Sequence, residues 1–240
     1  MAALISTPKI DRLVRSHRKT IALIVRPDGS LEVRAPKRAA MIQIQTFVIS
    51  KGDWIRKHQK RIKKRTEEIP QRMYREGEPF LYLGTSCKLF FSPRTNAVHL
   101  IHSELHTAPA QPAGLERQLT AWYRREARRI FTAQTEHIAQ TTGYRFNSIR
   151  INSARTRWGS CGPHGSLNFT WRLVMAPLPV INYVVLHELV HTKIRNHGSD
   201  FWKHVAEQEP NFQKYINWLN TNGHLLSIDV AADESLLQPL

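Results

Sequence analysis

The sequence predicts an α+β fold, in which a β-rich N-terminal part with a basic helix precedes a second part built from helices and a sheet. Stretches rich in β-branched residues dominate roughly the first hundred residues, whereas helical spacing of apolar residues dominates the later ones. A histidine motif of the form HExxH, at residues 187–191, lies in an apolar stretch that is typical of a buried helix.

In the N-terminal part, clusters of β-branched and aromatic residues between turn signals predict strands. They lie at residues 20–26, 31–36, 80–84, 88–92 and 97–102. The turn signal Pro-Asp-Gly at 27–29 joins the first two. Between about residues 39 and 64 the apolar spacing becomes helical and predicts a basic helix, which Gly52 interrupts.

Residues 103–114 contain two prolines and several small residues, and we expect a linker there. A long helix is predicted from about residue 115 to residue 141, closed by Thr142-Gly143. The remaining elements are strands at 148–153 and 166–173, a helix from about residue 178, and short helices at 200–208 and 211–220. The predicted organisation is a basic β-rich region at 1–110, a region with the histidine motif at 111–225 and an acidic tail at 226–240.

The composition restricts the class of protein. A formal net charge of +16 predicts attraction to polyanions, such as nucleic acid or an acidic membrane surface. Cys87 and Cys161 are too few for a disulfide scaffold and are expected to be free thiols. The first residues lack the apolar core of a signal peptide, and no apolar run is long enough for a membrane span. We therefore expect a cytoplasmic protein with no membrane partner.

The histidine motif has the geometry of a metal site. His187 and His191 are four residues apart, so on a helix their side chains are about 40° apart around the axis and reach one ion. Glu188 lies about 100° further round, where its carboxylate contacts a metal-bound water rather than the metal. Buried imidazoles beside a buried carboxylate need polar partners, and a metal ion would provide them.

A catalytic zinc ion usually keeps three protein ligands and one open position, so a third ligand is needed. His197 would point away on a continued helix, but its neighbours Asn196 and Gly198 tolerate the left-handed conformations that end helices. We therefore expect the chain to turn back and present His197, with Ser199 or Asp200 capping the next helix.

The competing third ligand is an acidic residue of a later helix, Glu207 or Glu209. With either ligand, the site predicts one zinc ion per chain, or another divalent metal, and hydrolysis by a metal-activated water. Glu188 would take a proton from the attacking water and deliver it to the leaving amine. A donor for the oxyanion is also expected, and the candidates are Tyr183, His164, His204, His224 and Arg157.

Three segments together resemble the YgjP-like metal-dependent hydrolases, zincin-type proteins that are related in pattern to the SprT and WLM peptidases. The segments are RTRWGSCGPHGSLNFTWRLVMAP at 155–177, INYVVLHELVH at 181–191 and NHGSDFW at 196–202. The resemblance extends from about His17 to Leu219 and is far more specific than HExxH alone. It implies that His187, His191 and His197 bind the metal, usually zinc, and that Glu188 is the general base.

The resemblance further implies that residues 111–225 form a zincin-like catalytic region acting on a protein or peptide. By analogy with zincins, residues 157–161 form an edge strand that binds an extended peptide by β-augmentation. The substrate-binding candidates are Arg157, Trp158, Gly159 and Tyr183. Core packing is the alternative for Trp158 and the favoured interpretation for Cys161. Metzincins have glycine where this chain has Ile194, so a different turn is expected here.

Most of the positive charge lies in the N-terminal part, because residues 1–75 contain 19 Lys+Arg and 6 Asp+Glu. The densest run, residues 51–65, has eight cations and one acid. A solvated helix face is the simpler interpretation. The alternative is a surface that binds the phosphates of nucleic acid, and its candidate residues are Arg56, Lys57, Lys60, Arg61, Lys63 and Lys64.

Two classes of function therefore compete. The first is a zinc-dependent peptidase, with nucleoprotein as one class of substrate. The second is a nucleic-acid-binding protein whose metal site is structural or vestigial. Glu188 favours the first, because a structural metal site has no need of a base beside an open coordination position. An amidase acting on small substrates is a third option with the same chemistry.

Overall fold

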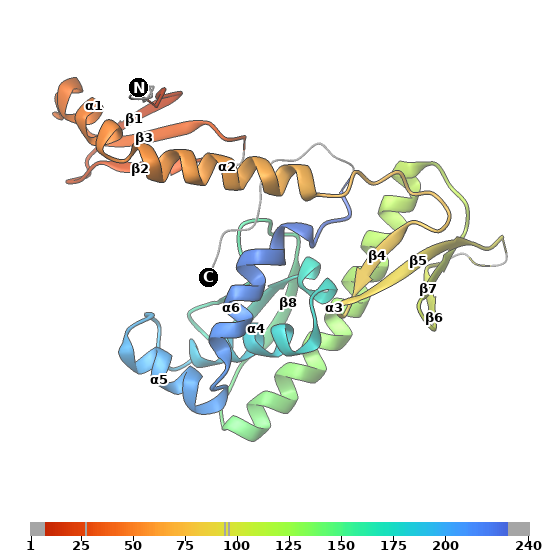
Figure 1. The fold of residues 1–240 in the computed structure, drawn as a ribbon. Coiled ribbons are helices and arrows are strands. Elements are labelled where there is room, and N and C mark those ends of the chain that lie inside the picture. The colour runs from red at the N-terminus through yellow and green to blue at the C-terminus, as the bar shows by residue number, and fades with distance from the viewer. Residues whose placement is uncertain (1–7, 27, 94, 96, 230–240) are drawn as a thin grey trace. The chain divides into compact units, whose positions relative to one another are not determined.

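The computed structural model describes residues 8–26, 28–93, 95 and 97–229. The chain divides into two compact units, Met1–Ile69 and Pro70–Leu240, and each has its own hydrophobic core. Each unit combines helices with strands, as Figure 1 shows, so the predicted α+β class is confirmed. In the part of the chain that is described, none of the helices combines the length and the apolar composition that a membrane span requires.

The first unit is a three-stranded sheet with two helices. Its strands β1 (Arg12–Ser16), β2 (Ala22–Val25) and β3 (Leu31–Pro36) lie in the order β1-β3-β2, with β1 parallel and β2 antiparallel to β3. Helices α1 (Met41–Ser50) and α2 (Gly52–Glu68) follow. The core joins β3 to both helices through Leu31, Val33, Ala35, Ile44, Val48 and Ile55.

The second unit begins with a four-stranded sheet in the order β4-β5-β7-β6. Its strands are β4 (Pro79–Tyr82), β5 (Thr85–Phe91), β6 (His99–Ile101) and β7 (Glu104–Thr107). The β4–β5 turn is bonded to later parts of the same unit, since the Leu83 amide donates to the Val174 carbonyl at 2.9 Å.

The boundary between the two units lies between Ile69 and Pro70, whereas the sequence predicts it near residue 110. The change in organisation expected at residue 110 lies inside the second unit, because β4–β7 pack with its later elements rather than with the basic strands. The expected linker at 103–114 is wrong in part, since Glu104–Thr107 forms β7. Of the expected acidic tail, residues 230–240 lie outside the described residues.

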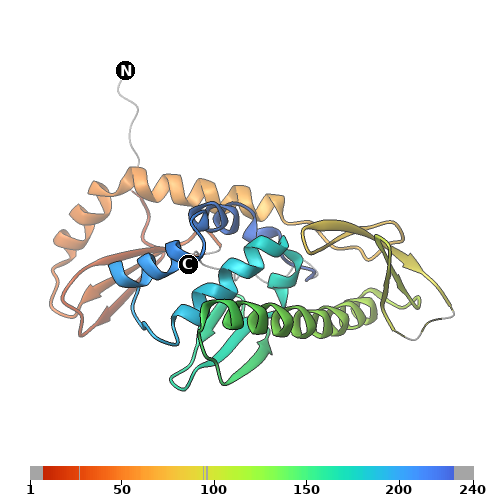
Figure 2. The same cartoon turned by 90° about the horizontal axis from the view of Figure 1, so that it is seen from below.

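The long helix α3 (Pro112–Thr142) leads into a second sheet of β8 (Ser148–Asn152), β9 (Gly159–Cys161) and β10 (Ser166–Thr170). Gly143, with φ of 72°, ends α3 in the left-handed conformation that glycine favours. The strand order is β8-β10-β9, which leaves β9 at an edge. Figure 2 shows α3 running beside these strands.

Helix α4 (Leu178–Val190) is the central helix of the second unit. It follows the 3-10 helix η1 (Trp171–Met175) and precedes α5 (Ser199–Gln208), α6 (Phe212–Asn222) and the 3-10 turn η2 (Gly223–Leu225). It contacts α3, α5, α6 and β9. A helix enclosed on all sides must be apolar around its whole circumference, which explains why most of LPVINYVVLHELV is apolar and buried.

Candidate metal centre

The last turn of α4 places His187 and Glu188 in the interior. Only 2% of His187 and 3% of Glu188 is exposed, because Phe201 of α5 packs on His187 and Gly159 of β9 lies against Glu188. Two polar side chains of this kind are costly to bury unless they find partners. The burial of His187 and Glu188 therefore indicates a functional site rather than a helix end with a purely structural role.

Beyond α4 the chain continues for one more turn and then leaves the helix. His191 is the C-cap, and the amides of Thr192, Lys193 and Ile194 still bond to carbonyls of the last helical turn. The expected left-handed break at Asn196 or Gly198 is wrong, since neither has a positive φ and Gly198 is extended at φ −73° and ψ −176°.

The start of α5 also differs from expectation. Gly198 is its N-cap and no side chain caps the helix, so the expected cap by Ser199 or Asp200 is wrong. Asp200 lies in the first turn instead, where a negative charge is favourable toward the helix dipole.

The turn brings His197 back to the other two histidines. Its Nε2 atom lies 3.0 Å from Nε2 of His187 and 3.1 Å from Nε2 of His191. One ligating atom from each of the three residues lies within 4.8 Å of the other two. Among the described residues no other group brings three such atoms together, so Glu207 and Glu209 are not part of the cluster.

Hydrogen bonds on the far side of the rings set which nitrogens face the cluster. Nδ1 of His191 donates to the Ile194 carbonyl at 2.9 Å. Because a carbonyl only accepts, that Nδ1 carries the proton and Nε2 of His191 presents a lone pair. Nδ1 of His187 lies 3.5 Å from the Tyr183 hydroxyl, which is the corresponding partner on α4.

Two aromatic residues of α5, Phe201 and Trp202, pack against the histidine cluster. The ring of Phe201, which is fully buried, lies 4.5–4.8 Å from the rings of all three histidines. Trp202 stacks on His197 with ring centroids 5.8 Å apart. This packing holds the imidazoles in one arrangement, a role of Phe201 that the motif NHGSDFW does not reveal.

Burial determines the protonation of the site. It lowers the pKa of His187 to about 3, with a further effect of the neighbouring His191 and His197. It also lowers the pKa of His191. Burial raises the pKa of Glu188 to about 8, and the positive charge of Arg157 opposes this increase. At neutral pH His187 and His191 are therefore neutral, which is the form that binds a metal.

The residues present fit a metal ion. Three imidazole nitrogens that are about 2.1 Å from one tetrahedral ion lie about 3.4 Å from each other, close to the separations found here. The Oε2 atom of Glu188 is buried and has no hydrogen-bond partner among the described residues. Three imidazole nitrogens beside an unpartnered carboxylate oxygen suit a metal ion that keeps an open coordination position.

Strand β9 forms the wall beside Glu188. Gly159 lies so close that a Cβ atom there would be 2.6 Å from Oε1 of Glu188. Arg157, just before the strand, is exposed and its charge acts on Glu188. Trp158 is 1% exposed and its ring lies against Gly223, so its side chain belongs to the core. Cys161 is a free thiol that is partly buried against the core.

The remaining oxyanion candidates lie away from the cluster or are engaged elsewhere. His164 is exposed in the β9–β10 turn. His204 bonds the Asp200 carbonyl of its own helix at 2.8 Å. His224 is buried in the turn η2. Of the five candidates, Tyr183 lies beside His187 and the positive charge of Arg157 acts on Glu188.

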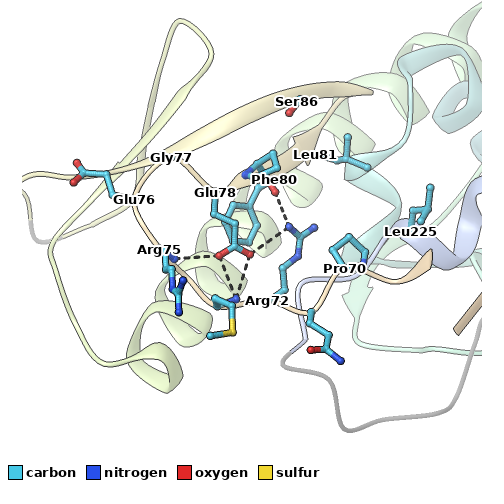
Figure 3. Close-up of a pocket in the computed structure, with 13 residues that line it drawn as sticks. Pro70, Arg72, Arg75, Glu76, Gly77, Glu78, Phe80, Leu81, Ser86 and Leu225 are labelled. Carbon is cyan, nitrogen blue, oxygen red and sulfur yellow. Dashed lines mark hydrogen bonds and ion pairs between the residues drawn. The ribbon is translucent and has the colours of Figure 1, made fainter. Parts of the chain in front are cut away.

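A separate cavity of about 720 Å³ lies between residues 70–81 and Leu225 (Figure 3). Its central side chains engage each other. Arg72 donates to the Pro79 carbonyl at 2.6 Å, lies 3.6 Å from Glu78 and stacks over Phe80. No residue of the histidine cluster lines this cavity, and its charged pair holds the segment before β4 in place.

The three histidines beside Glu188 are of the kind found in metal-dependent hydrolases. The family model described as "YgjP-like, metallopeptidase domain" matches residues 19–222, and the chain belongs to this family. The resemblance found in the sequence is thereby confirmed, and with it the enzyme class and a protein or peptide as substrate. A nucleic-acid-binding protein with a structural or vestigial metal site is not favoured.

Two solved structures are similar to part of the chain. The metallopeptidase zymogen abylysin of Pyrococcus abyssi is 20% identical, with 38% of this chain and 93% of that chain covered and a TM-score of 0.36. The metallopeptidase zymogen jannalysin of Methanocaldococcus jannaschii is 18% identical, with 38% and 95% covered and a TM-score of 0.35. Among curated proteins, none matches.

Proposed function

We propose that this chain is a zincin-like, zinc-dependent peptidase in which His187, His191 and His197 hold one zinc ion and Glu188 is the general base. One observation carries the proposal. Nε2 of His197 lies within hydrogen-bond distance of Nε2 of both His187 and His191, beside a buried carboxylate that has no partner on Oε2 among the described residues. Hydrogen bonds alone do not satisfy such a set, because Nε2 of His197 faces two other Nε2 atoms, and Nε2 of a neutral imidazole has either one proton or one lone pair.

The ligands are preorganised by their surroundings. The Ile194 carbonyl and the Tyr183 hydroxyl orient the rings of His191 and His187, and such outer partners raise the affinity of a histidine site for metal. When bound, zinc supplies a Lewis acid that polarises a carbonyl and lowers the pKa of a coordinated water. We assign Tyr183 to the support of His187, since its hydroxyl is turned to that ring.

Glu188 moves the protons. A carboxyl group whose pKa lies near 8 in the metal-free protein exchanges a proton readily at neutral pH, and a cation in the cluster would lower that pKa. Its Oε2 atom would accept a proton from the attacking water and return it to the nitrogen of the leaving amine. Its burial excludes bulk water from the proton transfer.

The edge strand β9 is the proposed binding site of the substrate backbone. An extended peptide adds to a free sheet edge through main-chain hydrogen bonds, and β9 lies at the edge of its sheet directly beside Glu188. Arg157 is exposed next to the strand and would donate to the oxyanion. Gly159 would contact substrate through its backbone, and Trp158 would anchor the strand from the core side.

The test is the variant Glu188→Gln, with Glu207→Gln as a matched control outside the cluster. Bound zinc and cleavage of a fluorogenic peptide library are measured in the same samples. We expect Glu188→Gln to keep one zinc ion per chain and to lose activity by about 10²–10⁴-fold, while Glu207→Gln keeps both. A Glu188→Gln protein that cleaves as fast as the wild type would contradict the proposal, and cleavage of small amides but no peptide would indicate an amidase.

We further propose nucleic acid as a partner of the first unit, because one observation favours it. The exposed face of α2 carries Arg56, Lys57, Lys60, Arg61, Lys63 and Lys64, while Ile55 faces the core of that unit. Two of these cations pair with acids, Arg56 with Asp53 and Lys64 with Glu68. Like charges three or four residues apart destabilise a helix by a few tenths of a kcal/mol per pair, so a polyanion would relieve the repulsion.

The test is a titration of single-stranded and duplex DNA at several salt concentrations. We expect an affinity that falls steeply with salt and that is lost in Lys57→Glu/Lys60→Glu/Arg61→Glu. The control variant Arg117→Glu/Arg128→Glu/Lys214→Glu has the same net charge and alters exposed residues of the second unit. Equal losses in both variants, or an affinity insensitive to salt, would show that α2 is only a solvated face.

A further inference from the structure

Arg195 connects the turn that carries the third histidine to the end of strand β9. Its Nη1 atom donates to the Gly162 carbonyl at 2.8 Å and its Nη2 atom to the Pro163 carbonyl at 2.6 Å. Nη1 also lies 3.6 Å from Sγ of Cys161. One side chain therefore reaches three consecutive residues that follow Gly159 on the wall of the site.

The segment from Arg195 to His197 needs such an anchor. The backbone bonds of the turn after α4 end with the Ile194 amide, which donates to the Val190 carbonyl. His197 itself is exposed, unlike the buried His187, and contacts the other two histidines and the aromatic pair of α5. The two hydrogen bonds of Arg195 are made two residues before His197, on a part of the chain that is otherwise at the surface.

We propose that Arg195 is a positioning residue that holds His197 at the metal centre by fixing its turn to the β9–β10 connection. This inference rests on the proposed metal site. The planar guanidinium group suits the task, because its two terminal nitrogens bond two carbonyls in a fixed geometry that a lysine ammonium does not reproduce. The same contact joins the metal-binding turn to the strand that is proposed to bind substrate.

Removal of the Arg195 guanidinium changes zinc affinity in one direction if Arg195 positions His197 and in the opposite direction if only its charge matters. A guanidinium group two residues from a ligand repels a bound cation, so its removal by itself would tighten zinc binding. Loss of the Arg195 hydrogen bonds instead makes the turn more mobile. The conformational entropy that is lost when His197 becomes ordered then weakens zinc binding. The two effects have opposite directions, and outer partners of metal ligands typically change affinity by about 10–100-fold.

The experiment measures zinc affinity by competition with a chromophoric chelator for wild type, Arg195→Ala, Arg195→Lys and the control Lys193→Ala. Lys193 is a cation of the same turn, but its Nζ lies over the Tyr144 ring, 4.6 Å from the centroid, whereas the bonds to the Gly162 and Pro163 carbonyls are made by Arg195. We expect Arg195→Ala to bind zinc about 10–100-fold more weakly, with Arg195→Lys close to it and Lys193→Ala within about twofold of the wild type. The peptidase activity of Arg195→Ala should recover at saturating zinc.

Unchanged or tighter zinc binding in Arg195→Ala would overturn the inference, as would wild-type affinity in Arg195→Lys. A wild type that binds no zinc would instead contradict the proposed function itself. Thermal unfolding of the metal-free variants is followed in parallel. Arg195 is exposed, so both variants are expected to fold, and Arg195→Lys carries the test if Arg195→Ala does not.

Discussion

The side chain of Glu188 occupies the space that a side chain at position 159 would fill, so Gly159 leaves room for it. A Cβ atom at position 159 would lie 2.6 Å from Oε1 of Glu188 and 2.7 Å from its Cγ, closer than real Cβ contacts. The glutamate is enclosed on its helix and the glycine is paired within a sheet, so neither backbone is free to withdraw. The proposed general base is therefore positioned by the proposed substrate strand.

The first prediction concerns Gly159→Ala. The added methyl group should displace the Glu188 carboxylate while leaving the three histidines in place. A displacement of about 1 Å at a catalytic group costs about 10²-fold in rate, so kcat should fall by about that factor with one zinc ion still bound. Peptide cleavage and metal content measured together check this outcome.

Gly114→Ala is the control for that substitution. Its Cβ would meet Cβ of Ala110 at 3.1 Å in the first turn of α3, away from the site. It should leave kcat and metal content unchanged. Wild-type kcat in Gly159→Ala, or a loss of zinc that accompanies the loss of rate, would show that position 159 does not act through Glu188.

The second prediction concerns the stability of the metal-free protein. Burial raises the pKa of Glu188 from 4.5 to about 8, so between these pH values the native state holds a proton that the unfolded state has released. The native state is therefore destabilised as pH rises through this window, by about 1.4 kcal/mol for each pKa unit at most, and the cost is complete above pH 8. Glu188→Gln lacks this titration.

Urea unfolding of both metal-free proteins between pH 4 and pH 9 measures the difference. The stability of Glu188→Gln relative to wild type should be constant below about pH 4.5, increase up to about pH 8 and then level off. His187 titrates in both proteins, so its loss of stability below pH 6.5 cancels in the comparison. A difference that does not change between pH 5 and pH 8 would mean that Glu188 is not buried as described.

The third prediction follows from the two separate cores. One core contains residues of the first unit only, and the other contains residues from Tyr74 to Ile228. We expect two unfolding transitions. Zinc should stabilise only the transition of the second unit, which contains the histidine cluster, by about 2.7 kcal/mol at a concentration of 100 times Kd. Calorimetry with zinc and with a chelator checks this, and a shift of both transitions would contradict the separation.

The sequence was sufficient where geometry is local. A helix fixes the relation of His187, Glu188 and His191, and the predicted strands at 20–26 and 31–36 contain β2 and β3. The helical pattern with Gly52 as its break became α1 and α2. The return of His197 was also expected, although the structure achieves it with ordinary backbone angles rather than with a left-handed residue.

Relations between distant segments could not be predicted in this way. The sequence predicts no strand at β1, because β1 pairs in parallel with β3 of a later segment, with Arg12 opposite Glu32. The sequence predicts a linker over β7 because two prolines follow it, while its pairing with β5 and β6 depends on residues of other segments. Arg195 and Gly162 are 33 residues apart, and nothing in either segment alone indicates that they meet.

The most direct test of the metal centre is X-ray diffraction from crystals of the zinc-loaded protein, with data collected on both sides of the zinc absorption edge. We expect one anomalous peak per chain, bonded to Nε2 of His187, His191 and His197 at about 2.0–2.1 Å, with Glu188 beside it but not a ligand. A peak at another group of residues, or coordination through Glu188 in place of one of the three histidines, would contradict it.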